Sequence, residues 1–537
     1  MNIIYAENPK NNCIESNILK ITDSHIIENY LTDESKIIKG SATEVVLPRC
    51  EKEISQILKE ANNKKIHVTI SGAGTGITGS RVPIDGIILS TEELRQVELK
   101  PSRNEKIIQY GIYGKTYTII IGKDQDGYYA IAPPGIPLTI FKKMVENENL
   151  FYPPDPTEMN AFLGGTIATN ASGARTFYYG PTRNYVKRLR IVLPNGDVLN
   201  IRRGQIFANN GIFIIILNNG EKIEVQIPKY TMPNIRKNSA GYYVMPNMDL
   251  IDLFIGSEGT LGMISEIEVK LIEKPKIIIS IFAHFMNEKN AIDFVKKLRN
   301  LSKLEKIKVL SIEFFDTHST DFIKKKYLPP KIPEKSESII DFEIEVSNEI
   351  ESDMVFEKIM PILEESNYLD AIVMPENEAK EIRHALPESI NDFIHTYKTQ
   401  KVATDISVPE DKFDEMFELY HKIGKQTGLH YVIFGHIGDN HLHFNFLPTN
   451  LNEVKKAMES VTLLLSEAVK LGGTVTAEHG VGKKYYISDD KHKPLLELMY
   501  GEEGVFEAAK LKHTIDPNHI LNIGNIIPKE YLDKINF

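Results

Sequence analysis

Four loops rich in small residues lie between Ser71 and Val269 of this chain. They read SGAGTGITGS from Ser71, IAPPGIPL from Ile131, LGGTIATNASGART from Leu163 and LFIGSEGTLGMISEIEV from Leu253. Glycine lets a ligand approach the main chain, and exposed amides in such loops hold pyrophosphate oxygens. One loop alone is equally well a tight structural turn, and the first lacks both the P-loop and the Rossmann pattern. Four together indicate a long, flat ligand lying close to the main chain.

A β–α–β unit precedes the first loop. Val45–Leu47 and Ile66–Ile70 are predicted strands, and Glu51–Lys64 carries apolar residues at helical spacing. Further on, Asn195 and Gly196 separate two apolar runs, which is typical of a β-hairpin. The first half of the chain is therefore predicted to mix helices with short strands.

A second region starts near residue 275 and alternates strands with helices. The strands are predicted at Ile277–Phe282, Val309–Phe315 and Ile339–Val346, and the helices at Asn290–Leu301 and Met354–Glu364. This alternation indicates an α+β domain with a broad sheet. A last helix is predicted from about residue 503.

Composition narrows the classes of function. The chain has 537 residues, enough for several domains, and its net charge of −10 argues against nucleic acid as a partner. Two cysteines exclude an iron–sulfur cluster held by this chain alone and favour a reducing, cytoplasmic setting. We see neither a signal-peptide pattern nor a transmembrane segment. Peripheral attachment to the inner face of a membrane stays open.

Two histidine-rich segments stand out in the second region. GHIGDNHLHFNF holds His436, His441 and His443, and TAEHGVGKK holds Glu478 and His479. Two histidines seven residues apart across a Gly-Asp turn can point to one place, and imidazole with carboxylate is a common ligand set for a divalent metal. The alternative is a group of hydrogen-bonded polar residues inside a sheet.

Together, the loops and the histidine segments resemble the vanillyl-alcohol oxidase-type flavoproteins. More narrowly, they resemble the branch of D-lactate, glycolate and D-2-hydroxyglutarate dehydrogenases, from about residue 40 to the C-terminus. This resemblance implies an α+β fold: a PCMH-type FAD-binding domain of two α/β subdomains, and a cap domain with a large antiparallel sheet flanked by helices. The implied parts are an N-terminal extension (1–37), the FAD-binding domain (38–274), a substrate or cap domain with the metal site (275–505) and a C-terminal segment returning to the FAD domain (506–537).

The resemblance also implies which residues bind FAD. The first loop has no His or Cys to which FAD could be attached, so we expect non-covalent FAD. The implied cofactor-binding residues are Ser71, Gly72, Ala73, Gly74, Thr75, Gly76, Gly79, Ser80, Pro133, Pro134, Gly135, Asp155, Pro156, Thr157, Gly164, Gly165, Thr166, Ala168, Thr169, Ser172, Gly173, Glu258, Gly259, Gly262, Ile264 and Asn522.

The histidine segments resemble the signature GHxGDGNLH…EHG of the metal-containing members. By that resemblance His436, His443 and Glu478 bind a divalent metal, with zinc expected first and manganese or iron as alternatives. His479 would be the catalytic base, and Asn445 would touch the substrate or shape its pocket.

One departure from this signature is visible. Asn440 and His441 stand where the family usually has Gly-Asn. His441 and His443 lie on the same face of an extended strand, because side chains alternate with period two. His441 could therefore support a ligand or compete as one.

A 2-hydroxy acid needs a cation for its carboxylate, and arginine offers a two-pronged hydrogen bond. Arg383, in IRHALPE, resembles the family's arginine, and Lys401, in KVATDISVP, is a second candidate. Without the resemblance, either would be read as a solvated surface charge.

The predicted activity is oxidation of a small D-2-hydroxy acid, D-lactate-like or glycolate-like, to the 2-oxo acid with hydride transfer to flavin N5. Its partners would be the acid and an electron acceptor such as a quinone, a flavoprotein or another carrier. A homodimer is the oligomeric state that we consider. The alternatives are an electron-transfer subunit without its own substrate, another oxidase of the same type, and a non-enzymatic binding protein.

Overall fold

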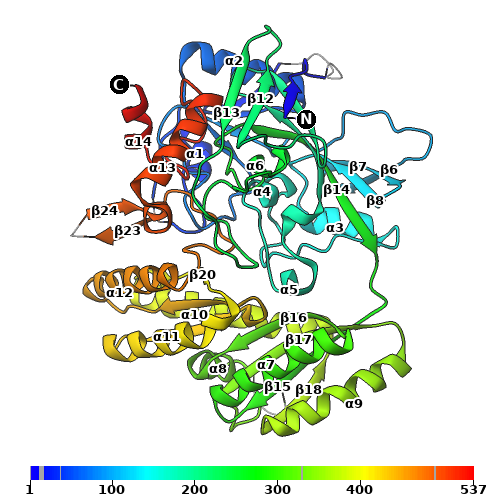
Figure 1. Ribbon diagram of the computed structural model, residues 1–537, viewed down its shortest axis with the longest axis vertical. Coiled ribbons are helices and arrows are strands. Elements are labelled where there is room, and N and C mark those ends of the chain that lie inside the picture. The colour runs from blue at the N-terminus through cyan, green and yellow to red at the C-terminus, as the bar shows by residue number, and fades with distance from the viewer. Residues whose placement is uncertain (1, 11–16, 37, 328–330, 489–490, 537) are drawn as a thin grey trace.

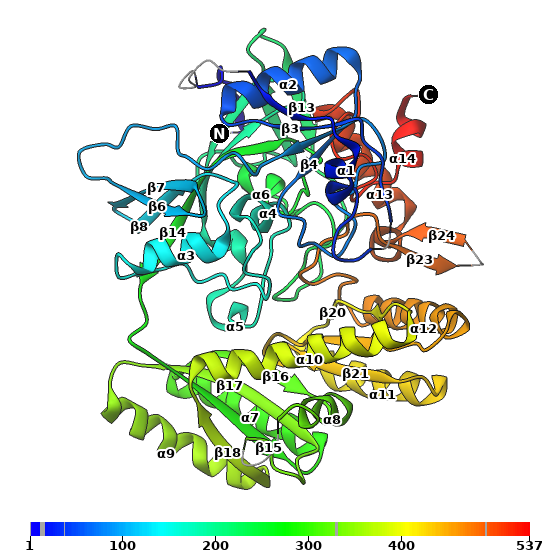
Figure 2. The ribbon, with the colours of Figure 1, turned by 180° about the vertical axis from the view of Figure 1, so that it is seen from behind.

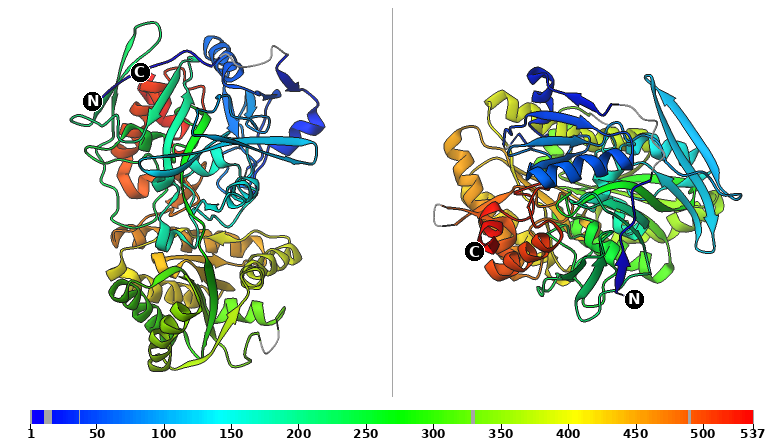
Figure 3. Two further views of the ribbon diagram at one scale, coloured as in Figure 1. Left: turned by 90° about the vertical axis from the view of Figure 1, so that its right-hand side faces the viewer. Right: turned by 90° about the horizontal axis from the view of Figure 1, so that it is seen from above.

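A computed structural model describes residues 2–10, 17–36, 38–327, 331–488 and 491–536. The molecule has two lobes stacked along its longest axis (Figure 1). The upper lobe holds the N-terminal half and the red C-terminal end, and the lower lobe holds the green-to-orange part of the chain. The same division is seen from behind (Figure 2) and from the side (Figure 3).

A small, mostly parallel sheet of the upper lobe contains the predicted β–α–β unit. Its order is β2-β3-β5-β4, and β3, β5 and β4 are parallel. Helix α2 (Glu51–Lys64) connects β3 to β4 and buries Ile54, Leu58 and Ala61, so the predicted unit is confirmed. The strands are β2 (Leu19–Ile21), β3 (Glu44–Leu47), β4 (Val68–Ser71) and β5 (Ile87–Ser90).

A second sheet of the upper lobe is antiparallel. Its β10–β11 pair is the hairpin predicted at Asn195-Gly196, with Val192 opposite Val198. The strands are β6 (Lys106–Ile112), β7 (Lys115–Asp124), β8 (Gly127–Ala132), β9 (Leu150–Phe151), β10 (Val186–Val192), β11 (Val198–Arg202) and β14 (Met263–Glu273).

Short helices and a third, small sheet complete this lobe. The helices are α1 (Ser24–Ile27), α3 (Leu138–Glu146), α4 (Leu163–Ala168), α5 (Thr176–Tyr179), α6 (Leu250–Phe254) and the 3₁₀ helices η1 (Glu28–Tyr30) and η2 (Thr182–Tyr185). The small sheet consists of β1 (Ile3–Tyr5), β12 (Ile212–Ile216) and β13 (Lys222–Gln226). Residues of the N-terminal stretch thus pair with two sheets of the body, through β1 and β2.

The lower lobe is built on one large antiparallel sheet, as predicted. Successive residues of β15 face opposite sides: Phe282 packs with α8 and α10, and Ile281 lies in the core shared with α7, α9 and α11. Helices therefore cover both faces. The strands are β15 (Ile277–Phe285), β16 (Lys308–Phe315), β17 (Ser338–Val346), β18 (Tyr368–Met374), β19 (Val402–Ala403), β20 (Ile406–Ser407), β21 (Tyr431–Gly435) and β22 (His441–Phe446).

The helices of the lower lobe run longer than the sequence patterns indicated. They are α7 (Glu288–Glu305), α8 (Thr317–Lys324), α9 (Glu349–Glu365), α10 (Glu376–Tyr397), α11 (Phe413–Thr427), α12 (Leu451–Lys470) and the 3₁₀ helices η3 (Glu410–Lys412) and η4 (Ile437–Asp439). Among the described residues, no helix is both long and apolar enough to cross a membrane.

The C-terminal segment lies against the upper lobe. Helix α13 (Leu495–Ile515) begins before the predicted residue 503. A kink at Gly501 (φ 67°) divides it, and its second part begins close to the predicted position. Downstream, the Ile70 amide donates to the Asn522 side chain at 2.7 Å. The remaining elements are β23 (Tyr485–Ser488), β24 (Lys491–Pro494), α14 (Lys529–Asp533) and the 3₁₀ helix η5 (Lys534–Asn536). We propose 38–274 and 275–505 as the two main domains.

Candidate active site

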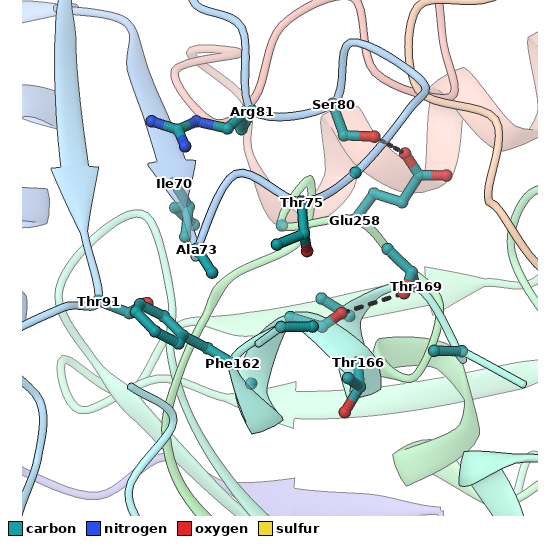
Figure 4. Close-up of a pocket in the computed structure, with 18 of the residues that line it drawn as sticks. Ile70, Ala73, Thr75, Ser80, Arg81, Thr91, Phe162, Thr166, Thr169 and Glu258 are labelled. Atoms are coloured by element: carbon teal, nitrogen blue, oxygen red, sulfur yellow. Dashed lines mark hydrogen bonds between the residues drawn. The ribbon is translucent and has the colours of Figure 1, made fainter. Parts of the chain in front are cut away.

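The small-residue loops line one cleft of about 350 Å³ in the upper lobe. Ala73 and Thr75 of the first loop lie opposite helix α4, which carries Thr166 (Figure 4). At one end, the Ser80 hydroxyl donates to the Glu258 carboxylate at 2.7 Å. Loops far apart in the sequence thus form a single surface.

Most of the residues implied to bind FAD line this cleft. They are Gly72, Ala73, Gly74, Thr75, Gly76, Ser80, Pro134, Pro156, Thr157, Gly164, Gly165, Thr166, Ala168, Thr169, Ser172, Glu258, Gly259, Gly262, Ile264 and Asn522. Those outside its lining are Ser71, Gly79, Pro133, Gly135, Asp155 and Gly173. Two of these support the wall from behind: a Cβ at Gly135 would lie 2.0 Å from the Thr91 carbonyl oxygen, and one at Gly173 would lie 2.0 Å from that of Asp155.

The lining leaves room for a flat ligand against the main chain. A Cβ added at Gly76 or at Gly165 would meet no heavy atom within 4 Å. Both glycines line the cleft from opposite loops. The residues present therefore fit the predicted FAD. Other lining residues were missed by the sequence reasoning. Arg81 and Phe162 directly flank two of the loops, and Asp33, from the N-terminal stretch, accepts a hydrogen bond from the Gly79 amide.

Three of the predicted residues meet in one buried cluster. The Nε2 atoms of His436 and His443 lie 3.2 Å and 3.3 Å from the same carboxylate oxygen, Oε1 of Glu478. His436 directly follows β21 and precedes η4, and His443 lies on β22. Between them, η4 ends at Asn440, which adopts the left-handed conformation (φ 54°). This tight return places both imidazoles beside the Glu478 loop.

Glu478 is held from its other side. The Lys237 ammonium donates to Oε2 at 3.0 Å, and the Ser172 hydroxyl donates to the same oxygen at 3.3 Å. Burial alone would raise the pKa of Glu478, but Lys237 and His436 hold it well below its usual range. Lys237 is fully buried. Its segment, KNSAGY, resembles a family segment near the flavin, but only its contacts in the fold connect Lys237 to Glu478.

His436 has a second carboxylate partner. Its Nδ1 lies 2.7 Å from Glu313 on β16. Burial lowers the pKa of His436, but the carboxylates of Glu313 and Glu478 together outweigh it and raise the pKa to about 9. Glu313 lies 123 positions away in the chain and carried no sequence signal.

Asp405 organises the other side of the cluster. Its carboxylate lies 3.2 Å from Nδ1 of His479 and 2.8 Å from Nε2 of His441, and it accepts from the Thr476 hydroxyl at 2.6 Å. Burial would raise the pKa of Asp405, but the imidazoles of His479 and His441 hold it well below its usual range. Asp405 lies in the segment KVATDISVP, quoted above only for its lysine.

The cluster opens onto the cleft. Glu478 and His479 line the same cavity as the small-residue loops. The His479 side chain keeps 27% of its surface exposed, whereas Glu478 keeps 8%. The imidazole of His479 is thus the more accessible of the two from the cleft, and the carboxylate of Glu478 is the more buried.

The donor set fits a divalent metal. One ligand atom from each of His436, His441, His443 and Glu478 lies within 4.8 Å of all the others. Two ligands on a tetrahedral zinc with bonds of 2.0–2.1 Å stand about 3.3 Å apart. The two N–O distances at Glu478 Oε1 match this spacing.

The remaining predicted residues lie at different places. Asn445 is buried on β22, two residues beyond His443, and its Nδ2 has no partner in the described part of the chain. Arg383 does not join the cluster; its guanidinium pairs with Asp341 and Glu343, each at 3.2 Å. Lys401 precedes β19, which pairs with β22.

Two family models match this chain. The model described as FAD binding domain matches residues 42–202, and the model described as FAD linked oxidases, C-terminal domain, matches residues 274–526. The chain belongs to the FAD-linked oxidases. The cleft is lined by residues of both matched regions, for example Gly72 and Glu478. The cluster also joins them, because Ser172 contacts Glu478.

Relatives of this FAD-linked oxidase are similar over almost their whole length. Glycolate oxidase subunit GlcD of Bacillus subtilis is 28% identical and covers 93% of this chain and 92% of its own. D-lactate dehydrogenase of Anaerostipes hadrus is 26% identical, with 95% and 94% covered. D-2-hydroxyglutarate dehydrogenase of Stutzerimonas stutzeri is 25% identical, with 94% and 95% covered.

Among solved structures, an alkyldihydroxyacetonephosphate synthase shares the fold of this oxidase. Its TM-score is 0.61 at 18% identity, covering 90% of this chain and 76% of that one. The predicted fold class, an FAD-binding domain with an α+β C-terminal domain, is confirmed.

Proposed function

We propose that this FAD-linked oxidase converts a small D-2-hydroxy acid to the 2-oxo acid, with FAD and a divalent metal as cofactors. One observation carries the proposal: Glu478 and His479 line the same cleft as the small-residue loops. Relatives named glycolate oxidase subunit, D-lactate dehydrogenase and D-2-hydroxyglutarate dehydrogenase support this class of substrate.

The loops would hold FAD along the cleft. Gly76 and Gly165 leave their main chain open to the ligand, and Glu258 accepts from the amides of Val481 and Gly482 at 2.7 Å and 2.8 Å. Those amides lie two and three residues beyond His479, so Glu258 fixes the His479 loop against the cleft. Bound there, FAD supplies the hydride acceptor.

His436, His443 and Glu478 would hold the metal next to the cleft. A bound divalent metal lowers the pKa of a hydroxyl that it holds and stabilises the charge that forms. Lys237 keeps Glu478 ionised and oriented, and Glu313 orients His436. Carboxylates that hold ligand imidazoles in this way are usual beside protein metals.

His479 would take the hydroxyl proton of the substrate. Asp405 lies 3.2 Å from its Nδ1, and its Nε2, 3.8 Å from Oε1 of Glu478, is the nitrogen that would accept a proton. Because Asp405 stays ionised, it stabilises the protonated imidazole and keeps the ring in one orientation. Asn445, with an unused buried Nδ2, would donate to an oxygen of the substrate.

Two cations are proposed for the substrate carboxylate. Arg383 is already balanced by Asp341 and Glu343, so part of its hydrogen-bonding capacity is used. Lys401 forms no ion pair with any residue that the structure describes, and it precedes the strand next to Asn445. Lys401 therefore has the freer charge, whereas Arg383 lies near Glu313, the partner of His436.

Electrons would leave to a quinone, a flavoprotein or another carrier, and we propose a cytoplasmic setting, at the inner face of a membrane if the acceptor is a quinone. The homodimer considered above also stays a proposal.

A panel of D- and L-2-hydroxy acids with an artificial dye acceptor tests the proposed reaction. We expect one or a few D-acids to reduce the dye, with kcat/KM for the L-form at least about tenfold lower. Equal rates for both enantiomers, or no reduction by any acid in protein that holds FAD, would contradict the proposal.

A further inference from the structure

His441 is the one histidine of the cluster that departs from the family signature. Its side chain is fully buried, and its Nε2 pairs with Asp405 at 2.8 Å. Its other nitrogen, Nδ1, is also buried and has no hydrogen-bond partner within the described ranges. A buried nitrogen without a partner costs free energy, so this atom calls for an explanation.

The free nitrogen faces the other ligands. Nδ1 of His441 lies 3.8 Å from Oε2 of Glu478, and its ring centroid lies 4.6 Å from that of His443. The ring centroid of His436 is 5.3 Å away. One donor atom of each of these four side chains lies within 4.8 Å of the other three. A single ion can therefore reach all four.

His441 is held in the same way as His436. Each imidazole has a carboxylate on the nitrogen remote from the cluster: Glu313 for His436 and Asp405 for His441. Such a partner fixes the tautomer, and the nitrogen that faces the cluster keeps its lone pair free for a metal. His441 is thus oriented as a ligand, through Nδ1 where His436 would use Nε2.

We propose that His441 is a further metal ligand, so that the site binds its ion with three imidazoles and one carboxylate. This inference rests on the proposed function, which places a metal at His436, His443 and Glu478. Four protein ligands would close a tetrahedral zinc site. The site is therefore suited to an ion that accepts five or six ligands, such as manganese, iron or cobalt, and keeps a position for a substrate oxygen.

X-ray absorption of the cobalt(II)-loaded protein counts the imidazoles directly. We expect three in the wild-type protein and two in His441→Asn, which restores the side chain of the family signature. In competition with a chelator, His441→Asn should bind cobalt at least about tenfold more weakly. His395→Asn, on the exposed end of α10, is the matched control and should behave as wild type.

Two imidazoles in the wild-type protein would overturn the inference, whether or not the variant folds. Cobalt affinity that is lost in His443→Asn and unchanged in His441→Asn would overturn it while leaving the proposed metal set intact. Cobalt affinity unchanged in both variants, or no cobalt bound by the wild type, would overturn the metal role in the proposed function as well.

Discussion

In the cleft, the surface that faces the ligand is formed by main chain and small side chains, such as those of Gly76 and Gly165. In the cluster beside it, imidazoles and carboxylates converge from β16, β22, the turn that follows β21 and two loops. A surface formed by main chain is blocked by adding atoms, whereas a set of converging side chains fails when one functional group is removed. The two regions should therefore fail separately, although they share a cavity.

The largest effect is expected from Glu478→Gln. It removes the charge that faces His436 and His443 but keeps the shape of the side chain. A metal contributes several kcal/mol to such a transition state, so turnover should fall on the order of 10³-fold. FAD content, read from the flavin absorbance after gel filtration, should not change. Glu381→Gln, on the exposed side of α10, is the control. Loss of FAD together with turnover would show that the two regions cannot be separated.

The converse change is Gly165→Val, which adds atoms to the cleft where no protein atom stands. The fold should tolerate it, and FAD should bind about 2 kcal/mol more weakly, roughly thirtyfold in Kd. Metal content per chain should stay at the wild-type value. Gly111→Val, on the exposed strand β6 and equally free of clashes, serves as control. Unchanged FAD affinity would mean that the flavin lies elsewhere.

A smaller loss is expected from Asp405→Asn, which acts through its neighbours. Asp405 holds His479 and His441 but does not line the cleft. Turnover should fall about tenfold, the lower end of what such supporting carboxylates contribute. FAD content should stay at the wild-type value, because Asp405 does not line the cleft. Loss of FAD together with turnover would indicate a general structural defect, and unchanged turnover would contradict the assigned role.

The smallest effect concerns stability and leaves both regions intact. Asp316 is buried at the start of α8, and burial raises its pKa to about 7. The folded protein therefore holds this proton more tightly than the unfolded chain does, and stability falls as the pH rises from about 4 to 7. Asp316→Asn should raise the unfolding temperature more at pH 8 than at pH 5, with Asp353→Asn, exposed on α9, as control. Equal changes at both pH values would contradict the assigned cause.

The two regions also differ in how far they could be predicted from sequence. The glycine loops carry their own signal, and α2 lies at the predicted Glu51–Lys64 because its buried residues follow helical spacing. That the loops share one cavity with His479 depends on tertiary packing, which no local pattern reports.

The cluster was predictable only in part. His436 and His443 could be paired because one tight turn separates them, whereas Glu313 and Asp405 join through long-range strand pairing and left no local pattern. For Arg383, the sequence did not show the two carboxylates of β17 that pair with it.

The central claim is that the cluster and the cleft act on one substrate. Anaerobic mixing of the FAD- and metal-loaded protein with its preferred D-2-hydroxy acid tests this claim, with the flavin absorbance followed over one turnover. We predict fast bleaching of the flavin band in the untreated protein. Bleaching should be abolished after treatment with a chelator and in His479→Ala, with FAD still bound in both. Bleaching at the same rate in chelator-treated protein and in His479→Ala would contradict the account.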